Sequence, residues 1–252
     1  MADRVALVTG ASSGIGRAVV VELCRRGLAV MAVARRAERL ERLADETGAA
    51  YHAVSVASPE GCAEAVEATR RRLGPVEVLV NNAAVGSAAD ASVLELDPLR
   101  WREIVALDLD APFELTRLCA PDMVAGGWGR VVTVSSISAL HGEPDSAAYC
   151  ASKAGLLGLT RSVAVDLARH GVTANAVLPG WVRTEMAERS AARDAAAAGI
   201  TVEQVWERRA ALYPSGRVVT PEEVASTVAF LASEAAGGVN GEAVTVAGGG
   251  AS

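Results

Sequence analysis

The sequence predicts a doubly wound α/β fold with a seven-stranded parallel sheet, formed as a single domain over residues 1–252. Short apolar runs rich in β-branched residues alternate with longer stretches of helical periodicity almost from end to end, which is typical of a parallel sheet covered on both faces. No linker, internal repeat or change of composition divides the chain. With 51% hydrophobic residues, the chain can bury one large core.

The first half of the chain contains four expected strands. Runs such as RVALVTG and AVMAVA are apolar and uninterrupted, as buried parallel strands are. Strands are expected at 4–10, 29–34, 51–56 and 76–82, and helices at 14–27, 36–48 and 59–74. Gly27 ends the first helix. Ser58 and Pro59 begin the third, because serine caps a helix N-terminus and proline fits its first turn.

The second half continues the alternation. Helices are expected at 97–123 and 147–171, and strands at 129–136, 172–180 and 241–249. Pro112 falls inside the first of these helices and should kink it. The least regular stretch, about 181–213, suggests helices after the sixth strand. Because open α/β sheets bind ligands beyond the carboxyl ends of their strands, this stretch is expected to form a substrate lid.

Charge and cysteine content narrow the classes of function. The net charge of −6 argues against general binding to nucleic acid or anionic membranes. The four cysteines form no C-x-x-C pair and have no histidine at ligand spacing, so free thiols are favoured over a disulfide or a metal site. The N-terminus does not resemble a signal peptide, and no window approaches the roughly 18 apolar residues of a membrane span. The sequence predicts a cytoplasmic protein without a nucleic-acid or membrane partner.

A glycine-rich turn joins the first strand to the first helix. In VTGASSGIG, Gly10 permits a tight turn, Gly14 lets the backbone approach a pyrophosphate, and Gly16 allows close packing of helix on strand. The spacing differs from the general G-x-G-x-x-G fingerprint, so its position directly after an N-terminal strand is what favours a dinucleotide over a plain packing turn.

The end of the second strand indicates which dinucleotide is bound. An acid there binds the ribose 2′-hydroxyl of NAD(H), whereas an arginine pairs with the 2′-phosphate of NADP(H). The stretch VMAVARR has Ala34 where the acid would stand and Arg35 next to it, and no carboxylate follows until Glu38. NADP(H) is favoured over NAD(H); the alternative is a surface arginine at a helix start.

The chain contains 24 basic residues, and Lys153 is its single lysine. Tyr149 lies four residues earlier on a predicted helix, so the two side chains share a face. Ser136 ends the fifth strand, beside the ligand crevice. Ketone reduction needs a hydride donor, a proton donor and a group that holds the carbonyl oxygen. Tyr149 can donate the proton and Ser136 the hydrogen bond, and the Lys153 ammonium is expected to lower the pKa of Tyr149.

Together these motifs resemble those of the short-chain dehydrogenases/reductases, over essentially the whole chain. The resemblance rests on TGASSGIG, NNAA, the serine pair ending at 136, YCASK, PGWVRT, PEEVASTVAFLAS and GEAVTVAGG. It implies a Rossmann sheet, NADP(H)-dependent interconversion of a ketone and a secondary alcohol, and a homotetramer or homodimer. The assembly would form through helices 97–123 and 147–171 and the C-terminal strand.

The resemblance also implies roles for individual residues. The catalytic residues are Ser136, Tyr149, Lys153 and, by its position, Asp108. The residues expected to bind the cofactor are Gly10, Ser12, Ser13, Gly14, Ile15, Gly16, Arg35, Ser55, Val56, Asn82, Ala83, Ala84, Tyr149, Lys153, Pro179, Gly180, Val182 and Thr184.

Three positions depart from the family pattern. Asp108 stands where members usually carry an asparagine that holds a water in the proton relay to the lysine. Ser55 replaces the usual aspartate at the adenine, and Ala84 adds a methyl group beside the nicotinamide. None of these changes removes the tyrosine, so activity is still expected, with a pH optimum altered by Asp108.

The substrate site is expected after the fifth and sixth strands. The expected lining is Ser138, Ala139, His141, Glu143, Trp181 and Met186 with the 185–213 segment. This region resembles members that reduce 3-ketoacyl thioesters and aromatic polyketides, so the substrate is a small ketone or alcohol that can be thioester-bound. Alternatives are a dehydrogenase of a small or cyclic secondary alcohol, a non-catalytic NADP(H) sensor, and an epimerase or dehydratase.

Overall fold

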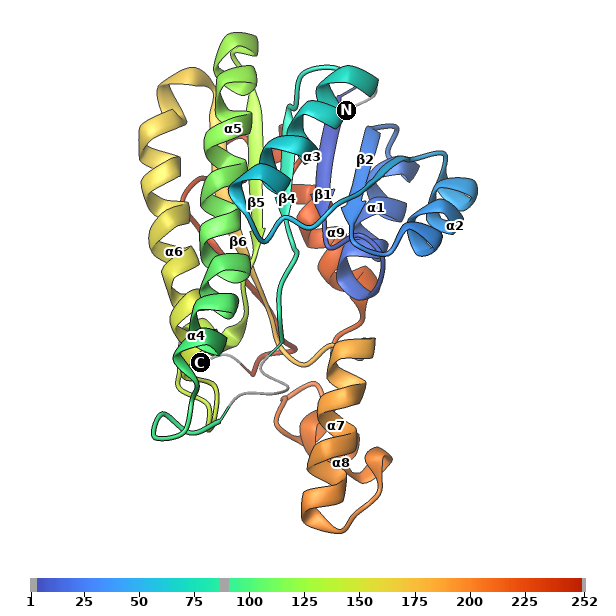
Figure 1. Ribbon diagram of the computed structural model, residues 1–252, viewed down its shortest axis with the longest axis vertical. Coiled ribbons are helices and arrows are strands. Elements are labelled where there is room, and N and C mark those ends of the chain that lie inside the picture. The colour runs from blue at the N-terminus through green and yellow to red at the C-terminus, as the bar shows by residue number, and fades with distance from the viewer. Residues whose placement is uncertain (1–3, 87–90, 251–252) are drawn as a thin grey trace.

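The computed structural model describes residues 4–86 and 91–250, and Figure 1 shows its parallel sheet between layers of helices. The ends of the expected 1–252 domain therefore lie outside the described residues. The sheet has seven strands in the order β3-β2-β1-β4-β5-β6-β7, all paired in parallel. The strands are β1 (Val5–Thr9), β2 (Ala29–Ala34), β3 (Ala50–Ala53), β4 (Val78–Asn81), β5 (Gly129–Val134), β6 (Val172–Pro179) and β7 (Ala243–Val246). The doubly wound fold predicted from the sequence is confirmed.

Alternate residues of each strand enter different layers of the core. Ala6 and Val8 of β1 pack in one cluster, which also contains residues of α1 (Gly14–Arg25), α2 (Ala37–Thr47) and α9 (Pro221–Leu231). Leu7 packs in a second cluster with α3 (Pro59–Arg72), α5 (Ala111–Gly126) and α6 (Ala147–Leu167). The central strands β1, β2 and β4 are buried on both faces and almost wholly apolar, which is why they could be located from the sequence, whereas β3 and β7 at the sheet edges are only partly buried.

Most element boundaries differ from expectation by a few residues. β3 ends at Ala53 rather than 56, and β5 ends at Val134, so Ser136 lies just beyond its strand. The sequence analysis assigned no helix to Pro221–Leu231, although Thr220 and Glu223 form a reciprocal capping box at its start.

The expected helix at 97–123 is divided into three segments. α4 (Pro98–Val105) leads into a π-helical turn, Ala106–Asp110, and then into α5. Pro112 has no N–H to donate to the carbonyl of Asp108, which favours a departure from α-helical pairing just before the proline. The irregularity expected at Pro112 is therefore a π turn preceding it, and the helix runs on to Gly126.

Two further helices, α7 (Glu185–Ala198) and α8 (Val202–Ala211), follow β6. They lie beyond the carboxyl ends of the strands, at the bottom of Figure 1. In the described part of the chain, no helix is both long and apolar enough to cross a membrane.

Candidate active site

A groove of about 1220 Å³ runs along the carboxyl ends of the strands. It passes the point where β1 pairs with β2 on one side and β4 on the other, where ligands bind in open α/β sheets. Of the residues expected at the cofactor, the structure brings to this groove Gly10, Ser12, Ser13, Gly14, Ile15, Gly16, Arg35, Ser55, Val56, Asn82, Ala83, Ala84, Tyr149, Lys153 and Thr184.

The glycine turn is held by Asn82. The Asn82 side-chain amide donates to the carbonyl of Thr9 at 2.9 Å, and a Cβ on Gly10 would lie 2.7 Å from that amide nitrogen. Gly14 has a φ of +53°, and a Cβ there would lie 3.0 Å from Thr184. The Ser13 side chain makes no capping bond to the first turn of α1 among the described residues. This helix start can thus present its N–H groups to an anion.

A basic cluster lies at one end of the groove. Arg36 donates to the hydroxyl of Ser12 at 2.9 and 3.1 Å and to that of Ser13 at 2.7 Å. Arg36 also pairs with Glu185, at the start of α7, at 3.3 Å, and Arg35 lines the same groove. The sequence analysis had singled out Arg35 alone. Nothing in the local sequence indicates a contact between Arg36 and residues 24 positions earlier.

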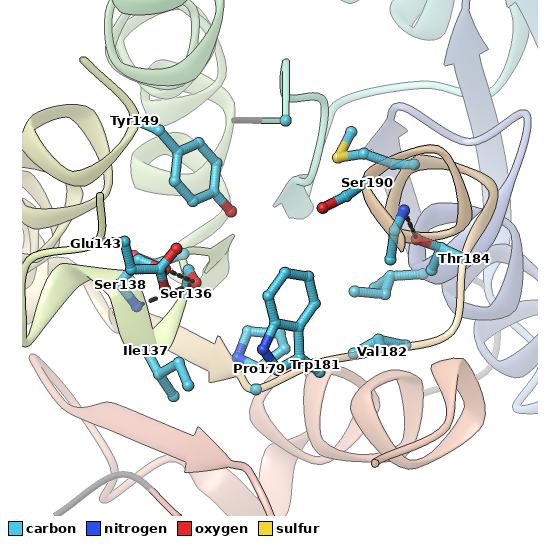
Figure 2. Close-up of a pocket in the computed structure, with 16 residues that line it drawn as sticks. Ser136, Ile137, Ser138, Glu143, Tyr149, Pro179, Trp181, Val182, Thr184 and Ser190 are labelled. Atoms are coloured by element: carbon cyan, nitrogen blue, oxygen red, sulfur yellow. Dashed lines mark hydrogen bonds between the residues drawn. The ribbon is translucent and has the colours of Figure 1, made fainter. Parts of the chain in front are cut away.

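A smaller cavity of about 140 Å³ adjoins the groove. Both are lined by Tyr149, Thr184 and Met186, so the tyrosine lies where they meet. Pro179, Gly180 and Val182, expected at the cofactor, line this cavity. Ser138, Trp181 and Met186 line it as the substrate prediction requires, together with Ile137 and Glu143. Figure 2 shows the hydroxyl of Tyr149 pointing into the space between these side chains.

The lining differs from the expected set at Ala139 and His141, which are not part of it, and within the 185–213 segment it includes Ser190. His141 is not among the lining residues; its side chain is 49% exposed and lies 3.7 Å from Glu143. The loop that carries it turns the ring to solvent. Ser190 of α7 does line the cavity, and its hydroxyl points inward from the side opposite Glu143 in Figure 2. The sequence predicted that the 185–213 segment lines this cavity, and the packing of α7 is what brings Ser190 of that segment to it.

Three elements bring the expected catalytic side chains together. Tyr149 and Lys153 lie one turn apart on α6, with the Lys153 ammonium 5.4 Å from the centre of the tyrosine ring. The hydroxyl of Ser135 at the end of β5 donates to the carbonyl of Lys153 at 2.9 Å, which ties the strand end to the helix. Ser136 follows directly and caps a short 3₁₀ turn by accepting from the N–H of Ser138 at 3.1 Å.

Asp108 faces Lys153 from the π turn. Its side chain is fully buried, as is that of Lys153 at 2% exposure. One carboxylate oxygen accepts from the N–H of Val85 at 2.7 Å, and the other lies 3.5 Å from the Lys153 ammonium. Burial raises the pKa of Asp108, while the charge of Lys153 and the hydrogen bond from Val85 act to lower it. Asp108 thus forms a direct ion pair with Lys153, from the position where the family resemblance implies an asparagine.

The Lys153 charge acts to lower the pKa of Tyr149, as the sequence predicts, but a larger effect opposes it. In the protein alone, burial raises the pKa of Tyr149, and this effect outweighs the opposing charge of Lys153. Asp108 also raises the pKa, because its negative charge disfavours the phenolate. The prediction took account of the Lys153 ammonium alone. It left out the desolvation of the Tyr149 ring and the charge of Asp108, the carboxylate that pairs with Lys153. Tyr149 is consequently held as a protonated phenol, the form that can donate a proton.

The wall formed by Trp181 is supported by α7 and α8. The guanidinium of Arg209 on α8 stacks on the Trp181 ring, 3.6 Å from its centre, and is almost fully buried. It donates to Asp194 and Ser190 of α7 at 2.7 and 2.9 Å. Trp181 also meets Trp206 of α8 edge to face, with the ring centres 6.5 Å apart. The two helices and this cavity wall are therefore one packed unit.

Comparison with known proteins gives consistent matches over the chain. Residues 10–251 match the family model described as enoyl-(acyl carrier protein) reductase. The chain is 37% identical to the acetoacetyl-CoA reductase of Rhizobium meliloti (strain 1021), with 98% of each chain covered. Its structure is similar to that of an actinorhodin polyketide ketoreductase variant with NADPH, at a TM-score of 0.94 and 36% identity, covering 100% and 99% of the two chains. It is also similar to levodione reductase, at a TM-score of 0.93 and 29% identity, covering 100% and 98%.

These matches and the arrangement of Ser136, Tyr149 and Lys153 agree with the resemblance drawn from the sequence motifs. The chain belongs to the short-chain dehydrogenase/reductase family and is an oxidoreductase that interconverts carbonyl and alcohol groups.

Proposed function

We propose that this protein uses NADPH to reduce the keto group of a 3-ketoacyl thioester or a related polyketide. The observation that carries the proposal is the position of Tyr149, at the junction of the long groove and the small cavity. A substrate carbonyl in the small cavity would lie between Tyr149 and a nicotinamide in the groove. The similarity to an acetoacetyl-CoA reductase and to a polyketide ketoreductase supports this substrate class.

The groove suits a dinucleotide with a 2′-phosphate. The glycine turn and the open start of α1 can take the pyrophosphate, since backbone N–H groups there bind anions. Arg35 and Arg36 supply two positive charges at the end of β2, and Arg36 is already hydrogen-bonded to Ser12 and Ser13. Guanidinium groups bind phosphate through charge-assisted hydrogen bonds. These contacts favour NADP(H) over NAD(H).

The chain's own residues divide the work of reduction. When bound, the nicotinamide supplies the hydride. Tyr149 donates its phenolic proton to the carbonyl oxygen, and Ser136 donates a hydrogen bond that holds the same oxygen. Lys153 stabilises the phenolate left on Tyr149 through its positive charge. In the protein alone, burial raises the pKa of Tyr149, so the phenol carries its proton when the carbonyl arrives.

Helices α7 and α8 form the substrate lid expected at about 181–213. Ser190 and Met186 of α7 line the small cavity, and Arg209 of α8 holds Trp181 against it. Because this unit covers the cavity from beyond the sheet, its movement would admit and release substrate.

The protein acts in the cytoplasm as a homodimer or homotetramer. All four cysteines are free thiols, which suits a reducing compartment. The assembly forms through the face of α4, α5 and α6, where large apolar side chains are exposed. These are Trp101, Phe113 and Val165, at 39%, 51% and 80% exposure.

A second candidate is reduction of a cyclic ketone, favoured by the structural similarity to levodione reductase.

The test of the proposed function measures NADPH and NADH oxidation with the acetoacetyl thioester of N-acetylcysteamine and with cyclohexanone derivatives. Preferential turnover of the thioester with NADPH is expected. Turnover of cyclic ketones alone would transfer the assignment to the second candidate. Tight NADPH binding without turnover of either class would favour the sensor.

A further inference from the structure

A single carboxylate enters the substrate cavity beside the catalytic serine. The hydroxyl of Ser138 donates to a carboxylate oxygen of Glu143 at 2.6 Å, and the hydroxyls of Ser136 and Ser138 are 3.0 Å apart. Since the Ser138 proton is directed to Glu143, the Ser136 proton is donated to Ser138 while the cavity is empty and can turn to a carbonyl oxygen that enters it. A hydrogen-bonded chain therefore runs from Ser136, which binds the carbonyl in the proposed function, through Ser138 to Glu143.

The rest of the cavity does not offset this charge. Among its described lining residues Glu143 is the only acidic one, and none is lysine, arginine or histidine. Arg209 stands behind Trp181, but its guanidinium is paired with Asp194. His141 lies 3.7 Å from Glu143 on the solvent side, outside the cavity lining. The charge of Glu143 also raises the pKa of Tyr149, so its field reaches the proton donor.

We propose that Glu143 selects substrates by their charge. The cavity accepts uncharged 3-keto esters and thioesters and excludes the free 3-keto carboxylates. This inference rests on the proposed function, because it takes the carbonyl to lie between Ser136 and Tyr149. A 3-keto acid in that position carries its carboxylate two bonds from the reacting carbon, close to Glu143. At an effective dielectric constant of about 20, like charges roughly 6 Å apart weaken binding by about two orders of magnitude before screening by salt.

The test compares ethyl acetoacetate with acetoacetate at about pH 8. In the wild type, kcat/KM for the ester should exceed that for the acid by roughly a hundredfold. Glu143→Gln keeps an acceptor for Ser138 and removes the charge. It should raise the ratio of kcat/KM for acetoacetate to that for the ester by at least about tenfold. Glu143→Asp should keep the exclusion.

The matched control is Asp145→Asn, which makes the same change of charge in the same exposed loop, outside the cavity lining. Asp145 has a φ of +53°, a conformation that asparagine tolerates. This control should leave both substrates unaffected. An unchanged ester-to-acid ratio in Glu143→Gln, or an equal loss with both substrates, would mean that Glu143 only fixes the loop and would overturn the inference.

Calorimetric binding separates this inference from the proposed function. Glu143→Gln should tighten the binding of acetoacetate by at least about tenfold relative to that of the ester, even if neither compound is reduced. Turnover of neither compound in the wild type would contradict the proposed function alone. Unaltered relative binding would contradict the inference alone.

Discussion

Asp108 is the residue at which this site departs most from the expected pattern. A buried carboxylate 3.5 Å from the Lys153 ammonium forms a direct ion pair within the catalytic group. Such a pair is costly to desolvate, and its geometry alone does not make it stabilising. Its effect on chemistry is clearer, because Asp108 and Lys153 act in opposite directions on the pKa of Tyr149.

Asp108→Asn should therefore shift the pH dependence of the enzyme. Removing the negative charge removes a contribution that raises the pKa of Tyr149, so the phenolate should form at lower pH. Oxidation of an alcohol needs the phenolate as base, and the rising limb of its pH profile should move to lower pH. Reduction at neutral pH should stay within about tenfold of the wild type, since the proton donor remains. The measurement is kcat/KM against pH in both directions. A profile that coincides with that of the wild type would place Asp108 outside the relay.

At the scale of elements, the connection between β2 and α2 carries the choice of cofactor. Arg36 is the residue before α2, and its guanidinium reaches across to the two serines of the glycine turn. The exposed Arg35 beside it lines the same groove. The same Arg36 pairs with Glu185 at the start of α7, so the 2′-phosphate end of the groove is linked to the helices over the substrate cavity.

Arg36→Ala and Arg35→Asp should each reduce the preference for NADPH. Loss of a charge-assisted hydrogen bond to a phosphate corresponds to about a tenfold to hundredfold fall in the ratio of kcat/KM for NADPH to that for NADH. Arg42→Ala on α2 is the control, because that residue is exposed and does not line the groove. If Arg36→Ala keeps the wild-type ratio, the serine-bound guanidinium has no part in recognising the phosphate.

The elements could be predicted where their pattern is local. The strands were located from their short apolar runs, although β3 and β7 at the sheet edges are only partly buried, and the Ser58 cap with Pro59 correctly marked the start of α3. Strand ends were misplaced by a few residues because turns set them. The π turn was not predicted, because it combines the missing N–H of Pro112 with a tertiary contact between Asp108 and Lys153.

The residues of the site likewise divide into those that a local sequence pattern reveals and those that it does not. The glycine turn and the Tyr149–Lys153 pair have fixed spacing, so the sequence was enough to find them. Arg36, Ser190 and the orientation of His141 depend on contacts between distant segments or on how a loop turns, and no local pattern encodes these. The direction of the Tyr149 pKa required the burial of the ring, which spacing does not reveal.

At the scale of the whole molecule, the α4–α6 face remains unpartnered in the single chain. Phe113 of α5 and Val165 of α6 are exposed, and these helices lie side by side in Figure 1. Sedimentation velocity should give a dimer or tetramer for the wild type at micromolar concentration. Phe113→Lys combined with Val165→Lys should shift it to a smaller species, because charges replace apolar contact area.

The control for assembly is Leu212→Lys, an exposed apolar residue that follows α8. This variant should sediment as the wild type does. A monomeric wild type, or a double variant of undiminished size, would show that this face is not the subunit interface.

The central claim is that Tyr149 donates the proton in an NADPH-dependent ketone reduction, and turnover by Tyr149→Phe tests it most directly. Removing one hydroxyl should lower kcat for an acetoacetyl thioester by about a hundredfold to ten-thousandfold, the usual contribution of a general acid. NADPH binding, followed by its fluorescence, should stay within about threefold, because the backbone cradle of the cofactor is unchanged. Tyr51→Phe on β3, outside both the groove and the cavity, should behave as the wild type does. A Tyr149→Phe enzyme with wild-type turnover would contradict the account.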